Sequence, residues 1–151
     1  MSVSVAIEPA RQPEVEALLA RGDEFAFSLY PADSCYLLDV SELERPGVNM
    51  FVARVDNIAA GTAALVERGD GTAELKRLFV DDSARGKGLA AGLLGAIETH
   101  ARDASVRVIQ LETGPKSYAA IALYEKHGYV RIPNFGQYVD DPHSYCMQKV
   151  L

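Results

Sequence analysis

A predicted strand, a glycine-rich turn and a predicted helix follow one another from Leu75 onward, and they constrain the fold more than any other stretch of the chain. Residues 75–80 read as a buried strand, and residues 85–88 are Arg-Gly-Lys-Gly. Apolar side chains then recur at helical spacing on one stripe: Leu89, Leu93, Leu94, Ile97 and Ala101. The first N–H groups of a helix lack intrahelical partners and carry the positive end of its dipole. The stretch therefore predicts a phosphate site at a helix N-terminus, or else a tight turn that binds nothing.

Gly86 and Gly88 suit a phosphate site because they lack a Cβ, which lets a ligand approach the backbone and makes positive φ angles accessible. Two common nucleotide-binding motifs nevertheless do not fit. A Walker loop requires a glycine where Asp81 stands and a serine or threonine where Gly88 stands. A dinucleotide-binding fingerprint requires a glycine where Ala91 stands, and an acidic residue that the sequence Arg-Val-Ile-Gln-Leu at 107–111 does not supply. The turn therefore matches neither motif.

Composition limits the class of protein. A chain of 151 residues can bury a substantial core, and we expect residues 1–151 to form one domain. It has no apolar run of the roughly 18 residues that a membrane span needs, and no basic segment typical of a secretory signal at its start. Cys35 and Cys146 are too few for a disulfide framework, and the formal charge of −6 disfavours nucleic-acid binding. We therefore expect a cytoplasmic protein that binds neither nucleic acid nor membrane.

Hydrophobic periodicity and turn residues predict the element order β-α-β-β-β-α-β-α-β-β. The predicted strands are 3–7, 49–54, 58–67, 72–80, 106–112, 129–132 and 144–150, and the predicted helices are 14–29, 88–103 and 117–127. Asp56-Asn57 is typical of a hairpin turn, Gly128 of a helix C-cap, and residues 30–46 of a loop with one helical turn at 40–43. This order predicts an α/β (α+β) fold, with a mixed, mostly antiparallel sheet of six to seven strands flanked by helices.

Residues 85–90 are Arg-Gly-Lys-Gly-Leu-Ala, residues 120–129 are Ala-Ile-Ala-Leu-Tyr-Glu-Lys-His-Gly-Tyr, and both segments resemble motifs of the GNAT family of N-acetyltransferases. Residues 85–90 are similar to the family's Q/R-x-x-G-x-G/A motif, and residues 120–129 resemble its A-x-x-L-Y-E-K-x-G-F/Y segment. The two stand in the family's order, and the resemblance covers residues 50–131 well. It implies the GNAT fold and an enzyme that moves an acetyl group from acetyl-CoA to a primary amine by direct attack in a ternary complex. The second hypothesis is a non-catalytic acyl-CoA-binding sensor or interaction domain on the same fold.

The resemblance also implies a donor site. Backbone amides of the turn would bind the CoA pyrophosphate, at Arg85, Gly86, Lys87, Gly88, Leu89 and Ala90. The end of the preceding strand would pair with the pantetheine arm, at Leu78, Phe79 and Val80, and Tyr124 would lie beside the sulfur. The chain departs from the family at Ser117, where asparagine is usual, and at Asp82, where proline is common. Asp81 and Asp82 would repel a pyrophosphate unless they face solvent.

An amine must be neutral to attack a thioester, so a carboxylate or an ordered water must remove its proton. Glu74 is the first candidate for this base, because several family members carry a catalytic glutamate there, and Glu112 is the second. The Tyr124 phenol would protonate the leaving thiolate, and a backbone N–H at Phe79 or Val80 would polarise the carbonyl. No metal is expected, because the three histidines lack metal-ligand spacing.

In the family, the acceptor normally contacts the first helical region and the C-terminal strands, which correspond here to residues 25–38 and 134–145. These stretches combine aromatic and acidic residues: Tyr30, Asp33, Tyr36, Phe135, Tyr138, Asp140, Asp141 and Tyr145. That chemistry suits a cationic small-molecule amine or a peptide amine. A second copy of the chain, forming a homodimer, is a further candidate partner.

Overall fold

The computed structural model describes residues 1–151 and contains seven strands and four α-helices. Along the chain these are β1 (Val3–Ile7), α1 (Pro13–Leu29), α2 (Val40–Leu43), β2 (Val48–Val55), β3 (Ile58–Glu67), β4 (Thr72–Val80), α3 (Leu89–Asp103), β5 (Val108–Thr113), α4 (Tyr118–Lys126), β6 (Val130–Arg131) and β7 (Tyr145–Val150). Single 3-10 turns lie at Ala32–Ser34, Asp82–Ala84 and Gly136–Tyr138. No helix combines the length and the apolarity needed to cross a bilayer.

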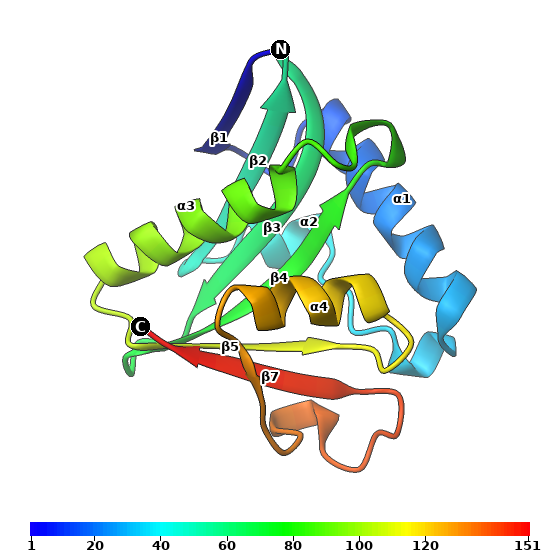
Figure 1. Cartoon of the computed structure of the whole chain (residues 1–151), viewed down its shortest axis with the longest axis vertical. Coiled ribbons are helices and arrows are strands. Elements are labelled where there is room, and N and C mark those ends of the chain that lie inside the picture. The colour runs from blue at the N-terminus through cyan, green and yellow to red at the C-terminus, as the bar shows by residue number, and fades with distance from the viewer.

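All seven strands form one sheet in the order β1-β2-β3-β4-β5-β7-β6. Only β4 and β5 pair in parallel, and every other pair is antiparallel. The expectation of a mixed, mostly antiparallel sheet with six to seven strands is therefore confirmed. Figure 1 shows α3 and α4 on one face of the sheet and α1 on the other.

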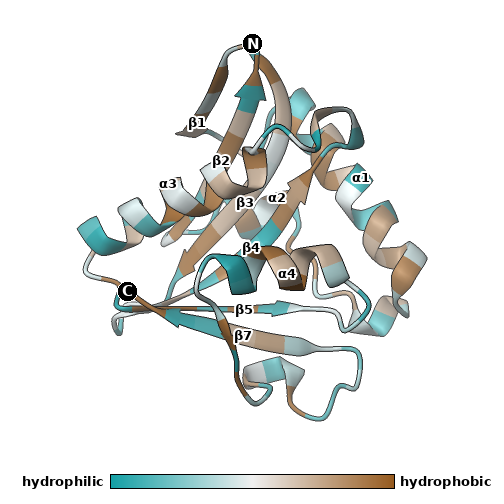
Figure 2. Cartoon of the chain, viewed as in Figure 1, coloured by the Kyte–Doolittle hydropathy of each residue, from teal (hydrophilic) through white to brown (hydrophobic).

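Because side chains alternate between the two faces along each strand, a separate hydrophobic core forms on each face of the sheet. On β2, Phe51 and Ala53 pack in the cluster that contains α3, whereas Met50 and Val52 pack in the cluster that contains α1 and α2. Successive side chains of a strand point to opposite faces, so a continuous apolar run can serve both cores. In Figure 2 the brown, hydrophobic residues accordingly run along β2 and β3, while α1 and α3 mix brown and teal.

The local predictions that depend on helix and turn chemistry are confirmed. All five residues of the predicted α3 stripe are buried. Asp56 and Asn57 both adopt positive φ, as a two-residue hairpin turn requires, and Gly128 follows the last turn of α4 with φ 92°. Residues 40–43 form the expected helical turn, capped by the Asp39 carboxylate.

Some predicted boundaries were wrong. The strand predicted at 106–112 begins only at Val108, because the Val106 N–H donates to the carbonyl of Ala101 at the end of α3. The last predicted strands also begin or end differently, at Val130–Arg131 and Tyr145–Val150. Residues 75–80 do not form a wholly buried strand, because the residues after Leu75 are only partly buried.

The partial exposure arises where β4 and β5 diverge, as Figure 1 shows. Their parallel pairing covers only Thr72–Leu75 against Val108–Leu111. Beyond it, β4 bulges against β3, with Arg77 at φ 60° and its carbonyl accepting a hydrogen bond from the buried Thr62 hydroxyl at 3.0 Å. The bulge re-aims the last residues of β4, and a gap opens between the two strands.

Candidate active site

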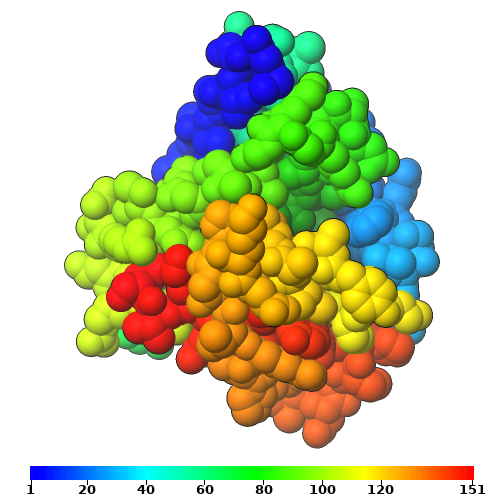
Figure 3. Space-filling view, viewed as in Figure 1, coloured from blue at the N-terminus to red at the C-terminus, as the bar shows by residue number.

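A cavity of about 920 Å³ occupies the gap between β4 and β5. Its wall is drawn from α1, the end of β4, the turn before α3, the end of β5 and the start of α4. Ten of the residues predicted for the donor site line it: Leu78, Phe79, Val80, Arg85, Gly86, Gly88, Leu89, Ala90, Ser117 and Tyr124. Lys87 and Glu74 do not line it. Figure 3 shows the yellow start of α4 meeting the blue residues of α1 beside the green turn.

Six consecutive backbone N–H groups, from Gly86 to Ala91, have no hydrogen-bond partner within the protein. The first intrahelical bond of α3 is donated by Gly92 to the carbonyl of Gly88. Gly86 and Gly88 adopt φ values of 78° and 77°, and a Cβ built on either would meet no atom within 4 Å. The glycines are therefore needed for the backbone conformation, which presents a row of donors and the positive end of the α3 dipole to an anion.

The two acidic residues before this turn are held by cations. The Asp81 carboxylate accepts a hydrogen bond from the Ser83 hydroxyl, which holds its pKa below the usual range, and pairs with Arg21 at 2.9 Å. Asp82 is exposed and pairs with Arg85 at 3.1 Å. The repulsion that these residues would exert on an anion is therefore reduced by Arg21 and Arg85.

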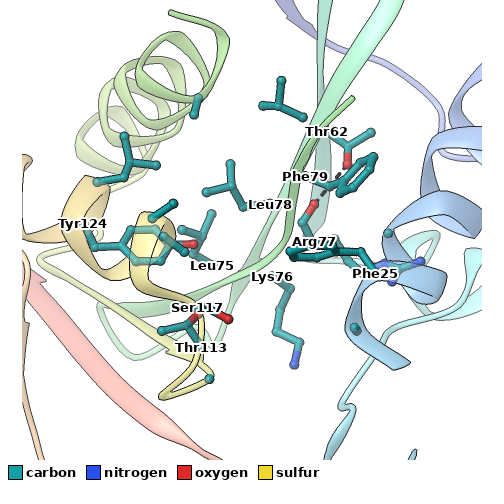
Figure 4. A pocket seen from close by; sticks show the side chains of 18 of the residues that line it. Phe25, Thr62, Leu75, Lys76, Arg77, Leu78, Phe79, Thr113, Ser117 and Tyr124 are labelled. Carbon is teal, nitrogen blue, oxygen red and sulfur yellow. Dashed lines mark hydrogen bonds between the residues drawn. The ribbon is translucent and has the colours of Figure 1, made fainter. Parts of the chain in front are cut away.

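Tyr124 extends from α4 into the cavity, toward Leu75 of β4 (Figure 4). Its ring packs edge-on against Tyr129, with the ring centroids 5.7 Å apart, and the side chain is almost completely buried. Burial raises the pKa of Tyr124 well above that of a free phenol, and the nearby charge of Glu112 raises it further. The hydroxyl is therefore neutral near pH 7 and can donate a proton.

Ser117 lines the cavity but is already hydrogen-bonded. Its hydroxyl lies 2.8 Å from the hydroxyl of Tyr30, which also accepts a hydrogen bond from the Lys116 N–H at 3.0 Å. The Tyr30 ring comes so close to Gly114 that a Cβ there would lie 1.9 Å from it. In this chain the serine at the asparagine position therefore helps to join the end of α1 to the start of α4. No signal in the sequence pointed to this pairing, because the two residues are far apart in the chain.

Glu112, the second candidate base, lines the cavity from the end of β5. Burial raises the pKa of its carboxyl group to about 7, although a hydrogen bond from the Ser144 hydroxyl at 2.8 Å acts in the opposite direction. A carboxylate with this pKa is largely ionised at slightly alkaline pH and still basic enough to take up a proton.

Glu74, the first candidate base, is engaged outside the cavity. Its carboxylate accepts a hydrogen bond from the Tyr138 hydroxyl at 2.5 Å and lies 3.3 Å from Arg68. Lys76 completes this cluster: its ammonium group donates to the Tyr138 hydroxyl at 2.8 Å and to the carbonyl of Tyr36 at 2.9 Å. The predicted base role of Glu74 therefore receives no support from its position.

The two predicted acceptor stretches contribute unequally to the cavity. From residues 25–38, the cavity is lined by Phe25, Ala26, Leu29, Tyr30 and Ser34–Leu37, but from residues 134–145 only His143 reaches it. Asp141 instead binds the first stretch, accepting hydrogen bonds from Tyr36 at 2.5 Å and Ser34 at 3.2 Å. The prediction also missed Leu18, Leu19 and Gly22, which line the cavity from earlier in α1. The amphipathic pattern of this helix was the only available signal.

Known proteins share both the sequence pattern and this architecture. A model of the acetyltransferase (GNAT) family matches residues 13–129. An IAA acetyltransferase of Azospirillum brasilense is 38% identical over 151 residues, covering 99% of each chain. A putative acyl-CoA N-acyltransferase structure from Klebsiella pneumoniae is 31% identical with a TM-score of 0.84, covering 99% of this chain and 97% of that one. The PaiA N-acetyltransferase of Thermoplasma acidophilum, solved with coenzyme A, shares the fold at 14% identity and a TM-score of 0.80, with each chain fully covered.

The comparison with relatives and the structure of the cavity support the same conclusion. The matched family region spans the diverging strands, the glycine turn and the whole of α4, which together carry the residues predicted for the donor site. The relative from Azospirillum aligns over nearly the whole of both chains. The chain therefore belongs to the GNAT family and is an acetyl-CoA-dependent N-acetyltransferase.

Proposed function

We propose that this enzyme acetylates a compact primary amine, with Glu112 as the base and Tyr124 as the acid. The observation that carries the proposal is that one cavity brings together a carboxyl group of pKa about 7, a neutral buried phenol and a row of unpartnered N–H groups. A proton acceptor, a proton donor and an anion cradle are the groups that acetyl transfer to an amine requires.

The donor end of the cavity fits acetyl-CoA. The N–H groups of residues 86–91 would hold the pyrophosphate, and the unpaired edge of β4 at Leu78–Val80 would hold the pantetheine arm. Lys87, which is exposed and outside the lining, would act only through its charge. When bound, acetyl-CoA supplies a thioester carbonyl that an amine can attack.

The reaction needs two proton movements, and the site has one residue for each. An alkyl amine has a pKa of about 10, so it arrives protonated and must lose a proton before it attacks. Glu112 would take up that proton, and the Tyr124 hydroxyl would give one to the departing thiolate. Glu112 takes precedence over Glu74 because it lines the cavity, whereas the Glu74 carboxylate binds Tyr138 and Arg68.

The acceptor end favours a compact amine with an apolar body. Its α1 wall carries Leu18, Leu19 and Leu29, and Glu112 provides a negative charge for an ammonium group. The hydrogen bonds from Ser34 and Tyr36 to Asp141 join the two acceptor stretches, which disfavours a polypeptide running between them. The net charge of −6 also favours the approach of a cation.

The test measures thiol release from acetyl-CoA across compact amines, polyamines, amino acids and short peptides. We expect turnover of a compact amine, and a Glu112→Gln variant that loses about a hundredfold or more in kcat while its calorimetric Kd for CoA stays unchanged. Glu74→Gln is the matched control and should keep most of the activity. Full activity in Glu112→Gln, or an equal loss in both variants, would contradict the base assignment, and preferred turnover of peptides would contradict the acceptor class.

A further inference from the structure

Glu112 stands at a point where the sheet gives its side chain little support. The parallel neighbour β4 has already diverged, since the β4–β5 register ends at Leu75 and Leu111. The antiparallel neighbour β7 places Cys146 opposite Glu112. One oxygen of the carboxylate accepts a hydrogen bond from the Ser144 hydroxyl at 2.8 Å, and no other protein group donates to either oxygen. One hydrogen bond therefore fixes the orientation of this carboxylate.

The segment that delivers Ser144 has its own clamp. The Asn134 side-chain amide lies 3.2 Å from each of three backbone carbonyl oxygens, those of Tyr138, Asp141 and Ser144. Residues 135–144 contain only a single 3-10 turn, so few hydrogen bonds of regular structure hold them. Ser144 itself is buried, with 5% of its surface exposed. Asn134 thus links the start of this β6–β7 segment (residues 135–144) to its end, and fixes the backbone that carries the Ser144 hydroxyl.

We propose that Ser144 is a positioning residue that orients the Glu112 carboxylate toward the acceptor amine, and that Asn134 acts through Ser144 by holding the β6–β7 segment in place. This inference rests on the proposed function, because it gives Glu112 the role of base. The hydroxyl binds one carboxylate oxygen and leaves the other free to receive the proton from the amine. A hydrogen bond donated to a carboxylate also favours its ionised form, so Ser144 opposes the effect of burial and increases the fraction of Glu112 that is ionised.

Other groups around Glu112 affect its titration and are held constant in the test. They come from every element packed near it: Lys76 and Glu74 of β4, Cys35 and Tyr36 of the α1–α2 segment, Tyr124 of α4, Asp141 and His143 of the β6–β7 segment, and Cys146 of β7. Lys76 favours the ionised carboxylate, whereas Asp141 and Glu74 disfavour it. Ser144 carries no charge, so its replacement changes the hydrogen bond without changing this field.

The first experiment compares wild type with Ser144→Ala and Ser144→Thr. A hydrogen bond to a charged group is strong enough to shift a pKa by about one unit. We expect Ser144→Ala to move the acidic limb of the kcat/KM profile upward by about one pH unit, while KM for acetyl-CoA stays constant. Ser144→Thr keeps the hydroxyl and should restore the wild-type limb. An unchanged limb in Ser144→Ala would overturn the proposal.

The second experiment tests whether Asn134 acts through Ser144. Asn134→Ala should move the same limb in the same direction, and the double variant should move it no further than Ser144→Ala alone. Additive shifts, or lower activity without a shift, would overturn the role of Asn134. Thermal unfolding of each variant shows that the comparison is made on folded protein.

A direct titration separates this inference from the proposed function. Carbon-13 NMR of the Glu112 carboxyl group reports its pKa whether or not Glu112 is the base. A higher pKa in Ser144→Ala, together with an inactive Glu112→Gln variant, supports both statements. A higher pKa with a fully active Glu112→Gln variant overturns the base role alone and leaves the hydrogen bond established. An unchanged pKa overturns the role of Ser144 even if Glu112→Gln is inactive.

Discussion

At the scale of single residues, burial sets the protonation of the two groups proposed for catalysis. Tyr124 and Glu112 line the same cavity, and burial raises the pKa of both. For the phenol this secures the proton at neutral pH, and for the carboxyl it produces a base of useful strength. The same physical effect therefore suits Tyr124 to the proposed role of acid and Glu112 to the proposed role of base, because their ordinary pKa values lie on opposite sides of neutrality.

Replacement of Tyr124 by phenylalanine tests the acid at this scale. The ring that packs on Tyr129 is kept and only the hydroxyl is lost, so we expect kcat to fall by about a hundredfold with an unchanged Kd for CoA. Tyr129→Phe is the matched control, because the Tyr129 hydroxyl binds Glu98 and does not line the cavity. Steady-state kinetics decide the matter, and full activity in Tyr124→Phe would refute the assignment.

The raised pKa of Glu112 also predicts a pH-dependent stability. In the unfolded chain this carboxyl titrates near 4.5, and in the folded enzyme near 7, so the folded state binds the proton more tightly. Between these pH values, rising pH ionises this carboxyl group in the unfolded chain before it does so in the folded enzyme. The free energy of unfolding therefore falls, by about 3 kcal/mol in total once the pH exceeds 7. Glu112→Gln has no such charge to bury. We expect it to unfold at a higher temperature than wild type at pH 8, with the gain vanishing toward pH 4.5, as calorimetry would measure; an equal gain at both pH values would contradict the cause.

At the scale of elements, the turn before α3 works through its backbone. Gly86 and Gly88 give the chain two positive φ angles, and the N–H groups that follow stay free of partners. Arg85 is engaged with Asp82 and its guanidinium lies 5.8 Å from the centre of the Phe25 ring. The expected phosphate site therefore depends on backbone N–H groups and the helix dipole, with side-chain charge at its rim.

A glutamate placed at Gly88 tests this element. The substitution puts a β-carbon in a left-handed conformation and a carboxylate at the proposed pyrophosphate site, so we expect CoA binding to be lost in calorimetry. Gly69→Glu is a matched control on the β3–β4 turn, with φ 78° and open space around its Cβ position. Both variants should lose similar stability, but Gly69→Glu should keep its affinity for CoA. Equal loss of affinity in both would argue against the turn.

At the scale of the whole molecule, the cavity exists because elements from both faces of the sheet meet where its interior strands β4 and β5 part. The α1 helix lies on one face and α4 on the other, and Tyr30 joins them beyond the end of β5 through Ser117 and Lys116. The divergence of β4 and β5 then leaves the space between them open. The alternative of a non-catalytic acyl-CoA sensor finds no support among the relatives, which carry acetyltransferase names.

Gly114→Ala tests the contact through which Tyr30 joins α1 to α4. The added methyl group would overlap Tyr30, so we expect a loss of about 1–3 kcal/mol in the free energy of unfolding and weaker binding of CoA. Gly95→Ala provides the contrast, because its Cβ position in α3 is open and alanine favours helix; that variant should gain up to about 1 kcal/mol and keep its affinity. Denaturant titration and calorimetry measure both. A neutral Gly114→Ala would show that the contact can relax.

The sequence alone determined the features that arise from local chemistry. Glycine φ angles, the apolar stripe of α3, the Asp56-Asn57 turn and the Tyr124 segment each depend on neighbours within a few residues, so the strand–turn–helix unit and the family could be recognised from them. The boundaries of β5 and β6 could not, because a hydrogen bond back to α3 and pairing with β7 decide where those strands begin and end.

Only the tertiary structure shows that Glu112 lines the cavity whereas Glu74 does not, and that the Ser117 hydroxyl is hydrogen-bonded to Tyr30. Both glutamates lie on strands that border the gap, and nothing local tells which carboxylate reaches the cavity. That depends on where β4 and β5 part and on what the β6–β7 segment brings beside them: Tyr138 against Glu74, and Ser144 against Glu112. A turn can be read from the chain because its residues are neighbours in sequence, whereas a carboxylate's surroundings are assembled from strands and loops that only folding brings together.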